Sequence, residues 1–256
     1  MSDIIDQGHV DLSIDNGIAI IEFGHPLSNS LPGKILRKLA SVISEQGKNP
    51  EVNVIVLKSS GDRAFCAGAS FDELLSIDNK QTGNIFFQGF AEVINACRKC
   101  PKFIIGRVQG KAVGGGVGLA SAVDYCLATK HASIKLSELA VGIGPFVVGP
   151  AVERKVGLSA MSSLTINATE WRSAQWALSN GLYSDIFEDA NEMDEEIQRL
   201  SNQLNNSNPE AMRLLKKVFW EGTDHWDELL SQRAAMSGEL VLSEFSKNSI
   251  SKFKKK

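Results

Sequence analysis

The sequence has few cysteines and no long hydrophobic run. Its four cysteines are spread over a chain of 256 residues, which is too few for a disulfide framework. No apolar stretch approaches the roughly 18 residues that cross a membrane. The first ten residues, MSDIIDQGHV, lack the basic and then apolar layout of a signal peptide. We therefore expect a cytoplasmic protein that has no membrane partner.

An excess of positive charge is also lacking. The chain carries 27 Lys and Arg against 30 Asp and Glu, which gives a formal net charge of −3. This balance argues against a general nucleic-acid binder. The composition, 43% hydrophobic and 22% charged, is that of a globular protein. The length suits one large domain, or a domain with a helical appendage.

Metal and nucleotide motifs are incomplete. Cys97 and Cys100 form a lone CxxC with no second ligand pair near them in sequence, so we expect both to be structural and no metal site. The stretches 116–121 and 142–147 begin like the GxGxxG dinucleotide fingerprint, but neither ends in glycine. No GKS or GKT follows a glycine loop, which excludes a P-loop.

The hydrophobic pattern predicts mixed strands and helices first, and then helices alone. We expect strands within 10–14, 18–21, 52–61, 103–108, 125–129 and 133–136. We expect helices over 31–43, from Ser70, and over 84–100, 169–180, 190–206, 209–221 and 223–245, with Ser30 and Ser70 as N-caps. This order indicates an α/β core over 1–190 and a helical module over 191–256.

The stretch GKAVGGGVGLASAVDY (110–125) places three consecutive glycines at the start of an apolar, helix-like segment. A glycine loop at a helix start leaves backbone N–H groups free, which suits an oxygen that gains negative charge during a reaction. Alternatively, the glycines serve only to let the helix pack tightly. A second small-residue loop, AFCAGASFDEL (64–74), also precedes a helix start and offers a second N–H donor.

Three motifs in order resemble the enoyl-CoA hydratase/isomerase (crotonase) superfamily. They are GDRAFCAGASFDEL, GKAVGGGVGLASAVDYCLAT and ASIKLSELAVGIGP, and the likeness covers nearly the whole chain. The resemblance implies an α/β (α+β) fold built as a ββα superhelix. It also implies C-terminal helices that form a homotrimer, often paired into a hexamer.

The resemblance also assigns residues. It implies an oxyanion hole made by the N–H groups of Ala69 and Gly115, and an acid/base at Glu138. A second catalytic glutamate of the family is replaced here by Gly118, and Asp124 is expected to be structural. The substrate is expected to be an acyl-CoA thioester, with CoA as part of the substrate and no separate cofactor. Further substrate contacts are implied for Ala67, Gly68, Gly114, Gly118, Pro145, Phe253 and Lys256.

Independently of the family, Leu136, Leu139 and Ala140 surround Glu138 with apolar sequence. A carboxyl in apolar surroundings has a raised pKa and suits proton transfer near neutral pH.

A single glutamate at this place is typical of two subgroups. The GGGVGL stretch and the spacing of Pro145 and Pro150 are similar to the 3-methylglutaconyl-CoA hydratase type, which acts in leucine breakdown. We therefore expect reversible hydration of a 2-enoyl-CoA that is branched or carboxylated. The alternatives are a Δ3,Δ2-enoyl-CoA isomerase and a non-catalytic acyl-CoA-binding protein that lost activity with its second glutamate.

Overall fold

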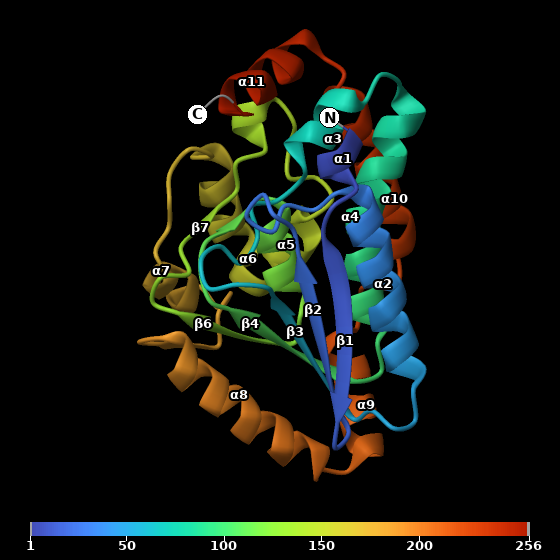
Figure 1. Cartoon of the computed structure of the whole chain (residues 1–256), viewed down its shortest axis with the longest axis vertical. Helices are drawn as coiled ribbons and strands as arrows, with labels where there is room; N and C mark the ends of the chain where they lie inside the picture. Colours follow the sequence, from blue (N-terminus) through green and yellow to red (C-terminus); the bar gives the residue numbers. More distant parts are fainter. Residues whose placement is uncertain (1, 255–256) are drawn as a thin grey trace.

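Strands and helices are mixed along the chain as far as β8, and helices alone follow (Figure 1). The computed structural model describes residues 2–254. Its strands are β1 (His9–Asp15), β2 (Ile18–Gly24), β3 (Val54–Ser59), β4 (Phe103–Val108), β5 (Ala112–Val113), β6 (Tyr125–Thr129), β7 (Ile134–Lys135) and β8 (Asp185–Phe187). Its helices are α1 (Ser2–Ile5), α2 (Gly33–Lys48), α3 (Phe71–Ser76), α4 (Lys80–Lys99), α5 (Gly115–Ala122), the 3-10 helix η1 (Leu139–Val141), α6 (Gly149–Ile166), α7 (Ala174–Ser179), α8 (Ala190–Asn205), α9 (Pro209–Phe219), α10 (Trp226–Leu240) and α11 (Glu244–Lys254).

The main sheet has the strand order β1-β2-β3-β4-β6-β8. β1 and β2 form the expected antiparallel hairpin, and all other neighbours in this sheet are parallel. β3 and β4 are central strands, and their near-continuous apolar sequences are buried as the pattern predicted. Because each parallel connection carries a helix, the loops that follow β3 and β4 reach the same edge of the sheet.

Helices cover both faces of the main sheet. α8 runs along one face, where Met193 and Ile197 pack against the side chains of Val54, Val56 and Ile105 (Figure 1). On the other face, α2, α4 and α5 enclose the larger hydrophobic core. This core places the first turn of α5 next to α4.

The C-terminal helices pack on the rest of the same chain. α10 lies along α4, and the two backbones approach so closely that a methyl group at Gly83 would lie 2.5 Å from the carbonyl oxygen of Gly238. α11 packs on α3 and η1. Ala234 and Leu230 of α10 belong to the larger core. The division into a core over 1–190 and an oligomerisation module over 191–256 stays a prediction.

The structure corrects two sequence predictions about helix starts. The helix predicted over 169–180 exists as α7, but it begins only after Ser173, whose hydroxyl accepts the N–H of Trp176. Ser30 does not cap α2, since its hydroxyl pairs with the ring of His25.

The cap of α2 comes from a distant helix instead. The N–H of Gly33, in the first turn of α2, donates to the carboxylate of Glu73 in α3 at 2.7 Å. The prediction for Ser70 is confirmed, because its hydroxyl accepts the N–H of Glu73.

A small second sheet leads to the site. β5 and β7 are parallel, with Val113 opposite Lys135. Single bridges extend this sheet on both sides, from Cys66 to Ala112 and from Ile134 to Arg172. The 64–74 loop therefore lies at one edge of the small sheet, and the segment before α7 lies at the other edge.

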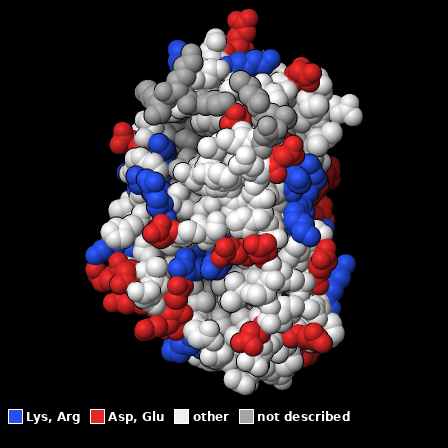
Figure 2. Space-filling view, in the orientation of Figure 1, with Lys and Arg blue, Asp and Glu red and all other residues white. Residues whose placement is uncertain are grey.

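Charges of both signs are interspersed over the surface visible in Figure 2, without one continuous field of either sign. Within residues 2–254, no helix is both long and apolar enough to span a bilayer.

Candidate active site

Two loops from neighbouring strands meet at the glycine triplet. The Cys66 carbonyl accepts the N–H of Val113 at 2.9 Å, and the Lys111 carbonyl accepts the N–H of Phe65 at 3.0 Å. Gly68 has φ = +88°, which favours glycine, and a methyl group there would lie 2.8 Å from the Val113 carbonyl oxygen. The same methyl position is 3.5 Å from the Gly115 nitrogen. The loops that carry Ala69 and Gly115 are thus in contact.

Two backbone donors at this junction have no acceptor. Around Ala69, the Gly68 carbonyl accepts the N–H of Leu31 and the Leu31 carbonyl accepts the N–H of Ser70. Across residues 2–254, no hydrogen bond is made by the N–H of Ala69 or of Gly115. Gly115 is the first residue of α5, where N–H groups have no partner within the helix and carry its partial positive charge.

Internal packing explains why glycine is needed in the triplet. A methyl group at Gly115 would lie 2.2 Å from the ring of Phe90, and one at Gly116 would lie 2.6 Å from the Cys66 carbonyl oxygen. The residues alone left open whether a ligand or packing excludes side chains here, and the family resemblance implied that the thioester carbonyl of the substrate does so. The contacts show that packing already does so at both positions.

The place of the missing second glutamate is filled by hydrocarbon. A methyl group at Gly118 would lie 2.4 Å from Cγ1 of Val148. Gly118 is a buried residue of α5 and does not line the pocket. No carboxylate could extend from this position unless Val148 moved.

Glu138 lies against the glycine triplet. It directly precedes η1, and a methyl group at Gly114 would lie 3.1 Å from its Oε1 atom. Its Oε2 atom is buried and has no hydrogen-bond partner within the described residues. Burial raises the pKa of this carboxyl from 4.5 to about 7, and a hydrogen bond from its own backbone opposes the rise. A group with such a pKa exchanges protons readily near neutral pH.

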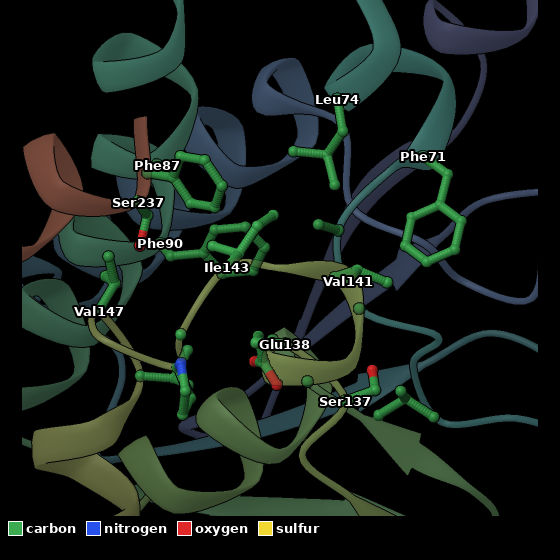
Figure 3. Close-up of a pocket in the computed structure, with 18 of the residues that line it drawn as sticks. Phe71, Leu74, Phe87, Phe90, Ser137, Glu138, Val141, Ile143, Val147 and Ser237 are labelled. Atoms are coloured by element: carbon green, nitrogen blue, oxygen red, sulfur yellow. The ribbon is translucent and has the colours of Figure 1, made fainter. Parts of the chain in front are cut away.

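A pocket opens above these groups, and its walls are almost entirely hydrocarbon. Figure 3 shows Glu138 on its floor, with Phe87, Phe90 and Ile143 among the apolar side chains above it. Ser137 and Ser237 are the other side chains with polar atoms that line it, in the described part of the chain. Glu138 is the single ionisable group in this lining.

The pocket gathers most of the residues singled out from the sequence. They are Ala67, Gly68, Ala69, Gly114, Gly115, Glu138 and Pro145. Gly118 and Phe253 do not line it, and Phe253 lies on α11 with 41% of its surface exposed. Lys256 lies outside the described residues.

Sequence reasoning missed the walls of the pocket. Phe87 and Phe90 come from α4, and Ser237 comes from α10. The aromatic residues at 86, 87 and 90 were a visible signal, since residues three or four apart share a helix face. That signal alone did not distinguish a pocket wall from core packing.

The cysteines take no part in this site. All four are free and buried, and burial raises the pKa of the Cys97 thiol to about 12. Nowhere between residues 2 and 254 do three His, Cys, Asp or Glu side chains group as they would around a metal ion.

The chain is similar in sequence to proteins that are named as hydratases of enoyl-CoA substrates. The chain is 28% identical over 249 residues to a probable enoyl-CoA hydratase of Bacillus subtilis, covering 96% of each protein. It is 25% identical over 252 residues to a short-chain-enoyl-CoA hydratase of Clostridium acetobutylicum, covering 97% of this chain and 95% of that protein. It is also 28% identical over 200 residues to the mitochondrial methylglutaconyl-CoA hydratase of Mus musculus, covering 77% of this chain and 63% of the mouse protein.

Solved structures and a family model complete the comparison. The crystal structure of an enoyl-CoA hydratase from Bacillus halodurans superposes with a TM-score of 0.87 at 20% identity, covering 95% of this chain and 99% of that one. This likeness confirms the expected crotonase-like α/β fold. The family model for enoyl-CoA hydratase/isomerase matches residues 13–256. The chain therefore belongs to the enoyl-CoA hydratase/isomerase family.

Proposed function

We propose that this chain catalyses the reversible hydration of a 2-enoyl-CoA, with Glu138 as its acid/base. One observation carries the proposal: a buried carboxyl with a pKa of about 7, whose Oε2 atom has no hydrogen-bond partner, lies near two backbone N–H groups that have no acceptor. That combination suits a reaction in which a proton moves while a carbonyl oxygen gains negative charge.

The thioester carbonyl oxygen accepts the N–H groups of Ala69 and Gly115. Addition of a nucleophile at C3 turns this carbonyl into an enolate, and its negative charge then lies on the oxygen that both donors face. The N-terminus of α5 adds a favourable partial charge. Donors already fixed in place stabilise the enolate without reorganising, which is usually the largest catalytic term.

Glu138 moves the proton. In its ionised form it accepts a proton from water, whose hydroxyl then bonds to C3 of the acyl group. The same carboxyl returns a proton to C2 and is ionised again, so the net change is the addition of one water. The two steps need one carboxyl, which agrees with the hydrocarbon that fills the position beside Gly118.

The acyl group is proposed to be branched, as in the 3-methylglutaconyl-CoA type. The distant likeness to the mouse enzyme and the apolar side chains of Phe87, Phe90 and Leu74 in the pocket wall support a branched chain. CoA enters as part of the substrate, and Phe253 and Lys256 are the proposed contacts of its distal end.

We also propose that the chain forms a homotrimer or a hexamer through its C-terminal helices. Support comes from apolar side chains of α9 that are about half exposed in the single chain. They are Leu214, Leu215, Val218 and Phe219.

A second candidate is a Δ3,Δ2-enoyl-CoA isomerase. The single carboxyl at Glu138 favours it, because one base can carry a proton between C4 and C2. A third candidate, acyl-CoA binding without catalysis, follows from the absence of glutamate at Gly118.

One assay separates the three candidates. The protein is incubated in heavy water with 3-methylglutaconyl-CoA, a linear 2-enoyl-CoA and a linear 3-enoyl-CoA, and the products are followed by mass spectrometry. We expect a gain of one water on a 2-enoyl-CoA. A shifted double bond with deuterium but without added water would replace the hydratase proposal with isomerisation. Tight binding without any reaction would replace both with the binding role.

A further inference from the structure

Two lysines contact the ring of one tryptophan beside the pocket. The Nζ atom of Lys135 lies 4.5 Å from the centroid of the Trp171 ring, and that of Lys111 lies 4.9 Å from it. Trp171 is 40% exposed, Lys111 is exposed and Lys135 is half-buried. Among residues 2–254, neither lysine forms an ion pair within 4.0 Å.

The positive charges of Lys111 and Lys135 repel each other. Burial and the charge of Lys111 lower the pKa of Lys135, and the carboxylate of Glu170 opposes this from beyond ion-pair distance. Two cations held over one ring repel each other, and the ring's negative face offsets only part of that repulsion. An anion placed between the two ammonium groups would remove the repulsion and gain charge-assisted hydrogen bonds.

The strand register places this pair next to the pocket. Lys135 is directly opposite Val113 in the β5–β7 sheet, and residues paired in this way project from the same face. Val113 lines the pocket, and Ser137, two residues beyond Lys135, lines it as well. The Lys135 carbonyl also accepts the N–H of Gly114 at 2.8 Å. The lysine pair thus borders the pocket on the side of Val113 and Ser137.

We propose that Lys111, Lys135 and Trp171 form an anion subsite for the substrate, which takes a carboxylate at the far end of the acyl group. The inference rests on the proposed acyl-CoA function. The pocket around Glu138 offers no cation, so an acyl carboxylate has to leave it to find one. Ser137 comes two residues after Lys135, the last residue of β7, and two residues of extended chain span about 7 Å. A five-carbon acyl chain and a lysine side chain can bridge that distance together.

A phosphate of the CoA moiety carries the same anionic oxygens. The subsite would bind it by the same contacts, so the test has to separate the two sources. It also has to work without turnover, so that failure of the subsite and failure of the proposed reaction are distinguishable.

The test measures the binding of two saturated thioesters by titration calorimetry. Glutaryl-CoA and pentanoyl-CoA have five-carbon acyl groups that differ in a terminal carboxylate, and neither can be hydrated. We expect the double variant Lys111→Gln/Lys135→Gln to weaken glutaryl-CoA binding about tenfold or more, and pentanoyl-CoA binding less than twofold. Lys38→Gln/Lys48→Gln, which removes two exposed charges of α2, should change neither affinity. Lys111→Arg/Lys135→Arg should restore most of the loss, because charge is kept.

Each other result has a defined meaning. An equal loss for both thioesters and for free CoA would support the subsite with a CoA phosphate as its anion. Unchanged affinity of the Gln variant for both thioesters, with wild-type binding intact, would overturn the subsite and leave the proposed reaction standing. A wild-type protein that binds neither thioester would overturn both proposals.

Discussion

Two carboxyl groups close to the glycine helix have opposite surroundings. Asp124 follows α5 and is surrounded by donors: the backbone N–H of Ile104 at 2.8 Å, the indole N–H of Trp220 at 3.0 Å, and the ammonium group of Lys216. Both of its oxygens are hydrogen-bonded and its charge is paired. Its side chain holds β4, α5 and α9 together.

Glu138 has none of these partners. Its Oε2 atom is buried without a donor, and no cation lies in the pocket lining. An unpaired buried carboxyl costs stability, and such costs are typical of sites that act on a ligand. The comparison teaches that burial alone does not separate a structural carboxyl from a reactive one. The number of donors around each oxygen does.

The largest effect is expected from the reactive carboxyl. Glu138→Gln keeps the shape of the side chain and removes its base, so kcat should fall about 10³-fold while the fold is kept. The rate of hydration of the preferred enoyl-CoA measures the fall in kcat, and thermal unfolding measures whether the fold is kept. Glu153→Gln, at an exposed position of α6, is the control and should retain activity. Full turnover in the Glu138 variant would assign the proton transfer to another group.

The structural carboxyl should show the reverse pattern. Asp124→Asn leaves Lys216 buried without its anion, which should lower the free energy of unfolding by about 3 kcal/mol. Urea denaturation measures this loss, and activity per folded molecule should change little. Glu188→Gln breaks the exposed pair with Lys130 and should leave the free energy of unfolding almost unchanged. Equal losses in the two variants would contradict the assigned role of Asp124.

The pH dependence follows from the carboxyl that lacks partners. Because Glu138 must be ionised to accept a proton from water, kcat/KM should fall about tenfold per unit as pH drops below about 7. A stopped assay between pH 5 and 8 measures this profile. An inflection near pH 4.5, the ordinary pKa of a glutamate carboxyl, would show that water solvates the Glu138 carboxyl and that its pKa is not raised.

Stability should change with pH in the opposite direction. The folded-state pKa of Glu138 lies above its unfolded value, so the folded state holds the proton more tightly. The resulting stabilisation is complete below about pH 4.5 and is lost as pH rises through about 7. Glu138→Gln should therefore gain stability relative to the wild-type chain over that same interval.

The glycine triplet offers a smaller test. Gly115→Ala places a methyl group against Phe90 and should lower the free energy of unfolding by about 2 kcal/mol. Adding Phe90→Leu should recover stability and much of the activity, since the N–H of Gly115 remains. Enoyl-CoA hydration and urea denaturation of both variants measure this. A stable but inactive double variant would show that the substrate itself excludes the methyl group.

These contacts show what could be predicted from the sequence. The apolar runs of β3 and β4 and the two small-residue loops were visible locally, because burial and helix starts depend on neighbouring residues. The position of Glu138 followed from its motif. The contact of Phe90 with Gly115 was not visible, since it joins two helices whose packing depends on the whole fold. The same holds for the donors around Asp124, which come from β4 and from the C-terminal end of α9.

α6 was missed for a local reason. Its first turn reads GPAV, and Gly157 inside it has φ = +75°, so its sequence lacks a regular helical pattern. Val148, just before this helix, is the residue that fills the space beside Gly118. The sequence therefore showed that Gly118 replaces the second glutamate, but it did not show that the side chain of Val148 fills the space beside Gly118.

That replacement gives the smallest predicted effect. Gly118→Glu alone should disrupt the core, because its side chain meets Val148. Together with Val148→Ala, it offers the pocket a second carboxyl beside Glu138. We expect hydration of crotonyl-CoA, a short linear substrate, to rise by up to about tenfold, with Val148→Ala alone as the matched control. An increase requires that a second proton donor limits the reaction on linear chains. A folded double variant without any increase would mean that Glu138 alone already supplies the proton transfers this pocket can use.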